Sequence, residues 1–275
     1  MLLSALTLNA ACKDKGNNNT NNINTHMTYN NAGQTTTEEK DVRITCIKDN
    51  KKERMMPLSL FGNIPERLID SLNIRDGIPA SMNAFLVKNG EITILFDTGL
   101  GGPDSQLMNA LDNKPENIKL IYLTHLHGDH IGGMMKGNKP VFTNAEIYLA
   151  REEYEGWMKM PEKAKAQVVK TMKAYEKHLH LFEFGDTLPG NVTALDGKGH
   201  TPGHTIYNVN NEILIAGDIM HGMALQLPHP EYCASYDMDT TEAVQTRKRI
   251  LKFASDNKID IAGMHIPLPG IISFK

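Results

Sequence analysis

Short apolar runs separated by polar turns recur along the chain from about residue 41 onward. Residues 42–48 alternate between apolar and polar positions, as a half-buried strand does. Residues 83–87 and 92–96 flank a polar turn and predict a β-hairpin. Further strands are predicted for six apolar runs, at residues 118–123, 141–149, 192–195, 206–209, 212–216 and 259–262. We therefore expect one folded domain over residues 41–275, with 259–262 as its last strand.

Three segments carry signals that are typical of helices. Residues 103–113 fit a short helix, and residues 151–180 are expected to be helical, with Pro161 in a first turn. Asp239 followed by Glu242 predicts the N-terminal cap of a further helix. The lysines of the 151–180 segment indicate a solvated face and not a nucleic-acid surface.

The first 40 residues differ from the rest of the chain. Residues 1–12 form an apolar stretch that is too short to span a bilayer, which needs about 20 residues, but suits a secretory signal. The residues up to Cys12 resemble a bacterial lipoprotein signal, with this cysteine as the lipid anchor. Residues 13–40 are rich in Asn, Thr, Gly and Lys, and predict a disordered polar linker. We expect an exported protein, membrane-anchored in the periplasm or at the cell surface; the alternative is a disordered cytoplasmic tail.

Composition narrows the class of protein. A chain of 275 residues with 40% hydrophobic and 22% charged residues can bury a large core and has ordinary globular composition. A formal net charge of -3 gives no electrostatic basis for nucleic-acid binding, so no nucleic-acid partner is expected. The three cysteines, Cys12, Cys46 and Cys233, show no Cys-x-x-Cys spacing and indicate neither a zinc site nor a disulfide framework.

The densest group of reactive side chains lies in residues 123–133, LTHLHGDHIGG. This stretch follows an apolar run, so it is expected to form a loop at the carboxyl end of a buried strand. Neutral imidazole and carboxylate groups suit Zn²⁺ and, less selectively, Fe or Mn. His125 and His127 can face one ion, and Asp129 and His130 a second. Four ligand-type side chains at this spacing predict a metal site.

The motif His-x-His-x-Asp-His after an apolar strand resembles the metallo-β-lactamase superfamily of hydrolases. This resemblance implies an α/β fold, the four-layer αββα sandwich, with one or two metal ions between its sheets. It also implies further ligands downstream, and a Thr-Pro-Gly-His motif is present at residues 201–204. The implied ligands are His125, His127 and His204 for one metal and Asp129, His130 and His265 for the other, with Asp218 between them.

Three other residues near the predicted site receive different roles. His200 is interpreted as a loop residue or as a support behind the ligands. His221 has no ligand match but could contact the substrate. Asp97 resembles a superfamily aspartate that orients a ligand imidazole; alternatively, it only caps a turn.

The implied site suits hydrolysis without a protein nucleophile. Two divalent ions, with Zn²⁺ expected and Fe, Mn or Co also compatible, would lower the pKa of bound water from about 15.7 towards about 7. The metal-bound hydroxide would then attack, and Asp129 and Asp218 are the expected catalytic carboxylates. The chain has no Gly-x-Ser-x-Gly motif, so nothing indicates a serine hydrolase.

Further segments resemble the methyl parathion hydrolase and acyl-homoserine lactonase branch of the superfamily, namely residues 83–87, 217–221, 226–230 and 265–270. This implies a small-molecule substrate, namely a lactone, a carboxylic ester or a phosphotriester that is cleaved. It also implies a pocket with aromatic walls, for which the available residues are Phe85, Trp157, Phe182 and Phe184. A glyoxalase II-like thioester hydrolase and a non-catalytic metal-binding protein remain as alternatives, and the oligomeric state is left open.

Overall fold

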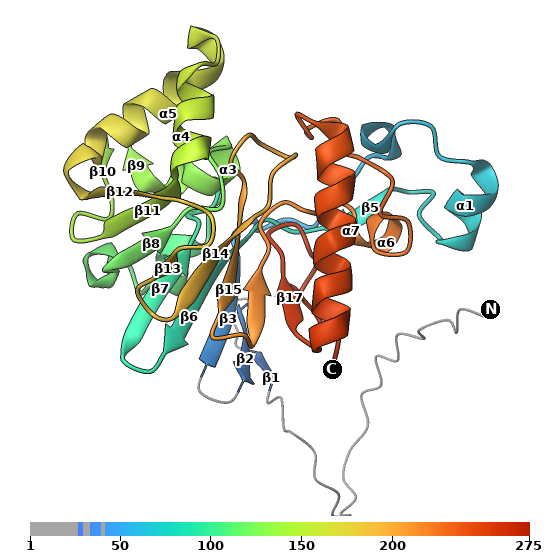
Figure 1. Cartoon of the computed structure of the whole chain (residues 1–275), viewed down its shortest axis with the longest axis horizontal. Coiled ribbons are helices and arrows are strands. Elements are labelled where there is room, and N and C mark those ends of the chain that lie inside the picture. The colour runs from blue at the N-terminus through green and yellow to red at the C-terminus, as the bar shows by residue number, and fades with distance from the viewer. Residues whose placement is uncertain (1–26, 30–33, 40–41) are drawn as a thin grey trace, which may run out of the picture.

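The computed structural model describes residues 27–29, 34–39 and 42–275, and shows two β-sheets with helices on their outer faces (Figure 1). The predicted signal segment with Cys12, and most of the predicted linker, lie outside the described residues and stay predictions. Within the described part of the chain, no helix is both long and apolar enough to cross a lipid bilayer.

The first sheet has eight strands in the order β1-β2-β3-β6-β7-β8-β11-β12. Its strands β6 and β7 form the predicted hairpin, and β8 lies parallel to both β7 and β11. The carboxyl ends of these three parallel strands meet at one edge, where loops can carry functional side chains. The bounds are β1 (Met27–Tyr29), β2 (Gln34–Glu39), β3 (Val42–Lys48), β6 (Asn83–Asn89), β7 (Ile92–Phe96), β8 (Leu120–Tyr122), β11 (Glu146–Ala150) and β12 (Leu179–Phe182).

The second sheet has six strands in the order β13-β14-β15-β16-β17-β18. Strand β18 follows the strand that was predicted to be the last, because the chain turns back after it and pairs with it in antiparallel fashion. The bounds are β13 (Thr187–Leu188), β14 (Val192–Asp196), β15 (Thr205–Val209), β16 (Ile213–Ile215), β17 (Asp260–Ala262) and β18 (Ile271–Ile272).

Three apolar clusters show how the layers pack, and they confirm the αββα sandwich. One cluster fills the space between the sheets, where Phe85 and Tyr122 of the first sheet meet Tyr207 of the second. A second joins the outer face of the first sheet to α2 (Leu107–Ala110), α4 (Arg151–Met158) and α5 (Glu162–Ala174). A third joins the outer face of the second sheet to α7 (Thr240–Asn257), drawn in red in Figure 1.

The long helix predicted at residues 151–180 is instead two helices and a one-turn segment. Helix α4 ends at Met158, and α5 begins after Pro161, whose ring cannot continue the preceding helix. The short 3₁₀ turn η4 (Glu176–His178) then leads into β12. By contrast, the cap predicted for α7 is confirmed, since the Asp239 carboxylate accepts the Glu242 backbone N–H.

The sheet begins before the expected domain boundary at residue 41. Strand β2 pairs with β3 over six positions, so at least residues 34–39 belong to the sheet and not to a disordered linker. Thr35 and Thr37 are buried, while Thr36 between them shares a hydrogen bond with Thr45 of β3. Polar composition alone misled the prediction, because β-branched threonines suit a strand whose backbone is paired.

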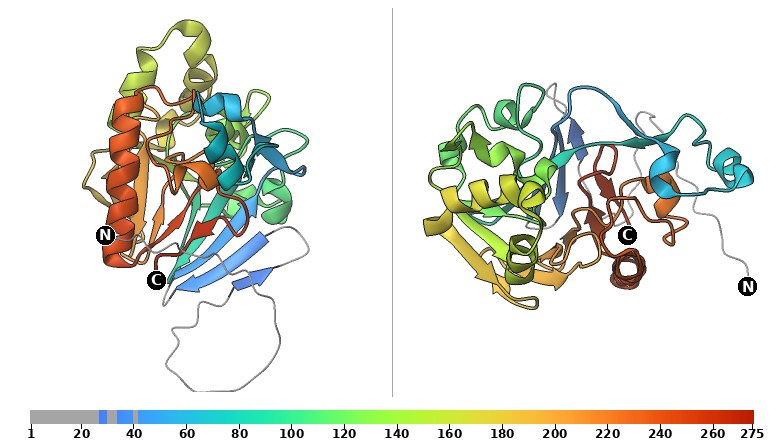
Figure 2. Two further views of the ribbon diagram at one scale, coloured as in Figure 1. Left: turned by 90° about the vertical axis from the view of Figure 1, so that its right-hand side faces the viewer. Right: turned by 90° about the horizontal axis from the view of Figure 1, so that it is seen from above.

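A lobe formed by residues 54–80 projects to one side of the sandwich, beside α6 (Met223–Gln226) (Figures 1 and 2). It has its own apolar cluster, and its elements are β4 (Arg54–Met56), η1 (Leu58–Phe61), α1 (Glu66–Ser71) and β5 (Ile78–Ala80). The remaining short elements flank β8 in the chain: η2 (Pro115–Asn117) precedes it, and α3 (Gly128–Ile131), η3 (Gly132–Met134), β9 (Met135–Lys136) and β10 (Lys139–Pro140) follow it.

Candidate metal centre

The predicted ligand loop leaves the carboxyl end of β8 and ends in the single turn α3. The neighbouring β7 strand delivers Asp97, whose carboxylate accepts both the backbone N–H and the hydroxyl of Thr124, at 2.8 and 2.7 Å. Asp97 is fully buried, so these bonds hold the start of the loop against the sheet.

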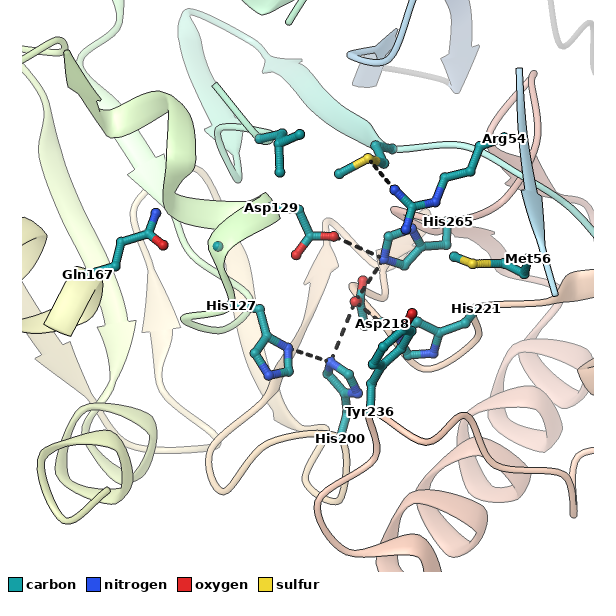
Figure 3. Close-up of a pocket in the computed structure, with 13 residues that line it drawn as sticks. Arg54, Met56, His127, Asp129, Gln167, His200, Asp218, His221, Tyr236 and His265 are labelled. Carbon is teal, nitrogen blue, oxygen red and sulfur yellow. Dashed lines mark hydrogen bonds and ion pairs between the residues drawn. The ribbon is translucent and has the colours of Figure 1, made fainter. Parts of the chain in front are cut away.

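Three imidazoles converge at this edge. His127 Nδ1 lies 2.9 Å from His200 Nε2 (Figure 3). The same nitrogen of His127 lies 3.0 Å from His125 Nε2. The opposite nitrogens of two rings donate elsewhere, His125 Nδ1 to the Thr124 hydroxyl at 3.1 Å and His200 Nδ1 to the Asp237 carboxylate at 2.9 Å. Burial lowers the pKa of both His127 and His200 to about 4 and that of His125 well below its usual value. All three are therefore neutral rings with lone pairs aimed at one point.

The structure corrects the assignment of His204 as the third imidazole, because His200 occupies that place. His204 Nε2 accepts the backbone N–H of Asp218 at 2.9 Å, so its lone pair is already used. The ring is also enclosed by glycines: a Cβ on Gly217 would lie 2.4 Å from Nε2, and one on Gly197 would lie 2.6 Å from Nδ1. No room for an ion remains beside His204, whose role is to support the Asp218 loop.

A second group contains Asp129, His130 and His265. His130 Nδ1 donates to Asp97 at 2.6 Å, as the aspartate's predicted supporting role requires, and His265 Nδ1 donates to the Ser81 carbonyl at 2.8 Å. These bonds turn both Nε2 atoms inward, towards the carboxylates of Asp129 and Asp218. Burial alone would lower the pKa of each ring, but the carboxylates outweigh it and raise both pKa values.

Asp218 lies between the two groups, as predicted. Its Oδ2 is 3.0 Å from His265 Nε2, 3.5 Å from His200 Nε2 and 3.8 Å from His125 Nε2. Burial tends to raise the pKa of this carboxyl, but His130 and His265 outweigh it and hold the pKa well below its usual range. His221 also approaches, with Nε2 3.3 Å from Asp218 Oδ2 and its ring stacked on that of His265.

The donor set fits divalent cations. Buried imidazoles and ionised carboxylates face one another in a confined space, an arrangement that a cation stabilises. Asp218 Oδ1 is buried, 3.2 Å from His130 Nε2. His125, His127 and His200 would hold one ion, and Asp129, His130 and His265 a second, with Asp218 shared. Six of the seven ligands expected from sequence are thus brought together, and His200 replaces His204.

A sequence model of the metallo-β-lactamase superfamily matches residues 78–261, more than half of the chain. The chain belongs to the metallo-β-lactamase superfamily. The hydrolase AbOPH, from the same superfamily, is a similar solved structure, with 30% identity and a TM-score of 0.77 over 89% of this chain and 94% of that one. AidC, described as a dizinc quorum-quenching lactonase, has 27% identity and a TM-score of 0.77 over 87% of this chain and 92% of AidC.

A curated relative, the uncharacterized protein YobT of Bacillus subtilis, is 27% identical over 146 residues. The match spans 50% of this chain and 61% of YobT, less than two thirds of that protein. This match says nothing about a substrate.

Behind this superfamily ligand set lies a buried carboxylate that sequence reasoning missed. Glu153 of α4 is fully buried, and its Oε1 accepts the Leu126 N–H and the Trp157 indole N–H at 2.9 and 2.7 Å. Its Oε2 accepts the Thr201 hydroxyl and the Gly203 N–H at 2.7 and 2.8 Å. The side chain therefore joins the loops that carry His127 and His200. In the sequence it looks like its exposed neighbour Glu152, so no local signal marks it.

The Glu153→Ala variant is expected to lower the free energy of unfolding by about 3 kcal/mol, since four buried donors lose their acceptor. The measurement is urea unfolding followed by circular dichroism. Glu152→Ala is the matched control; it removes a half-exposed carboxylate 3.2 Å from Lys198 and should change stability by about 0.5 kcal/mol or less. Equal effects of the two variants would contradict the bridging role of Glu153.

Residues of both ligand groups line a cleft of about 480 Å³. None of the aromatic residues suggested as pocket walls lines it: Phe85 and Phe182 lie between the sheets, Phe184 packs against the same cluster, and Trp157 is buried edge-on to His127. The apolar walls are instead Met56, Met82 and Leu100, and the aromatic contribution is Tyr236. Methionine side chains are flexible, so these walls can adapt to more than one substrate shape.

Proposed function

We propose that the protein is a metal-dependent hydrolase that cleaves a lactone, a carboxylic ester or a phosphotriester. It would use two divalent metal ions, and Zn²⁺ is the expected metal. The observation that carries this proposal is the paired imidazole and carboxylate groups, joined by Asp218, at the floor of an open cleft. The similarity to AidC, described as a dizinc lactonase, supports both the metal count and the substrate class.

Two bound ions would supply polarisation of the substrate carbonyl or phosphoryl oxygen and activation of a water molecule. Side chains of the protein would handle the proton and orient the substrate. Asp129 is the cleft carboxylate with the greater exposure, 25% of its side chain, and can hold a proton at its oxygens close to the scissile bond. His221 and Tyr236 stand 5.4 Å apart, ring centre to ring centre, at the cleft, where they can orient the substrate.

The test is kcat/KM of the zinc-loaded protein on an acyl-homoserine lactone, an aryl ester, an aryl phosphotriester and S-lactoylglutathione. We expect one of the first three to exceed the others by about 100-fold, since a pocket shaped for one class discriminates by about 2.7 kcal/mol in the transition state. A preference for S-lactoylglutathione would replace this proposal with thioester hydrolysis. Bound metal without turnover of any substrate would favour a non-catalytic metal-binding protein.

A further inference from the structure

An arginine stands at the wall of the same cleft. Arg54 belongs to β4, in the lobe of residues 54–80, and lines the cleft together with Asp129, Asp218 and His265 (Figure 3). Its Nη1 lies 3.0 Å from the sulfur of Met82, a weak acceptor that also lines the cleft. This weak contact leaves most of the guanidinium's hydrogen-bond donors unused.

Four of the seven arginines of the described chain pair with a carboxylate, and Arg54 is among the three for which no such pair is found. Arg43, Arg75, Arg151 and Arg247 each form an ion pair with an aspartate or glutamate. No such pair is found for Arg54 among the described residues, and it is the only lysine or arginine that lines the cleft. A guanidinium presents five donors in a planar fork that matches a carboxylate.

The superfamily's shared features do not account for Arg54. It precedes residues 78–261, which match the superfamily model, and it is not part of either ligand group. Asp129, the more exposed acidic side chain of the cleft, lies 3.6 Å from His265 Nε2, within the second group. A molecule that enters the cleft can therefore supply an acid group to Arg54.

We propose that Arg54 binds a carboxylate of the substrate, so that the preferred substrate is an ester or lactone that carries a carboxylate in addition to the bond that is cleaved. This inference rests on the proposed hydrolase function and specifies its substrate class. A neutral ester or phosphotriester would leave the guanidinium with only water and a thioether, whereas an acidic substituent gains a charge-assisted, two-point contact. A polar group built to meet a substrate group discriminates against the analogue that lacks it.

Two substrates of equal chain length test this: 4-nitrophenyl hexanoate and the mono-4-nitrophenyl ester of adipic acid, which adds a terminal carboxylate. The zinc-loaded protein is expected to prefer the acidic ester by about 10- to 100-fold in kcat/KM, the range of a charge-assisted hydrogen bond. Arg54→Met should abolish the preference mainly through KM and leave the neutral ester within about threefold. Arg54→Lys should keep part of it, because the charge remains without the fork.

The matched control is Lys52→Met, which removes a positive charge from an exposed neighbour outside the cleft and should keep the full preference. A second readout needs no turnover: adipate should raise the Tm of the zinc-loaded protein more than hexanoate does, and Arg54→Met should remove the difference.

The possible outcomes distinguish a failure of the Arg54 inference from a failure of the hydrolase proposal. Equal turnover of both esters, or a preference that Arg54→Met leaves intact, would overturn the role of Arg54 while the hydrolase proposal stands. No turnover above that of the Asp218→Asn protein would count against the hydrolase proposal; an Arg54-dependent effect of adipate on Tm would then still support a carboxylate site. No difference between adipate and hexanoate in either readout would overturn the inference.

Discussion

The Asp218→Asn variant is expected to lose about 1000-fold or more in kcat/KM on the best substrate of the panel. Asp218 is the carboxylate shared by both ligand groups, and its low pKa keeps it ionised at neutral pH. Asparagine has the same size but no charge, and its NH₂ group would place donors where the carboxylate supplies only acceptors. Removal of a single shared ligand should therefore disturb both metal positions at once.

Metal content by mass spectrometry and kcat/KM are measured on the same samples of this variant. Asp256→Asn is the control, since Asp256 is an exposed residue of α7 that pairs only with Lys252 among the described residues. An unchanged far-ultraviolet circular dichroism spectrum would show that Asp218→Asn folds. Activity within about tenfold of the parent protein, with both metal ions retained, would contradict the shared-ligand assignment.

The second large effect distinguishes His200 from His204. His200→Gln is expected to lose one metal ion per chain and about 100- to 1000-fold in kcat/KM, because a converging ring nitrogen disappears. His204→Gln should retain the metal ions, since its Nε2 already accepts the Asp218 N–H, and should instead lower the free energy of unfolding by about 1–3 kcal/mol.

Metal stoichiometry decides between the two histidines, and urea unfolding separates loss of stability from loss of metal. His178→Gln provides a control for the loss of an imidazole, since His178 is exposed and pairs with Glu146 far from the ligand groups. If His204→Gln lost a metal ion and His200→Gln kept both, the assignment from sequence would be restored and the interpretation of the structure would be wrong.

Much of the fold follows from local patterns. The hairpin of β6 and β7 was predicted because apolar runs flank a polar turn, and the start of α7 because Asp239 can accept the N–H of Glu242 three residues later. The ligand loop was also predicted from the sequence, because one short segment after a buried strand contains His125, His127, Asp129 and His130. Each of these signals lies within a few residues of the feature that it specifies.

Other features were missed where a contact with another segment decides the outcome. The threonine-rich strand β2 is ordered by its pairing with β3, the next strand in the chain, which polar composition does not reveal. Glu153 and Glu152 are neighbours in one helix, yet only the first is buried, and the difference comes from two loops that pack against one face of α4.

By itself, the sequence determined the superfamily, the strand that carries the ligand loop, and the residue types available for two divalent ions. Only the tertiary structure decided which of His200 and His204 faces the other imidazoles, because both occur in one motif and the Asp218 backbone and two glycines enclose the second. It also placed Arg54 at the cleft, 71 positions before His125 in the chain. Local patterns record the preferences of a segment, whereas a site depends on which distant surfaces pack together and which lone pairs remain free.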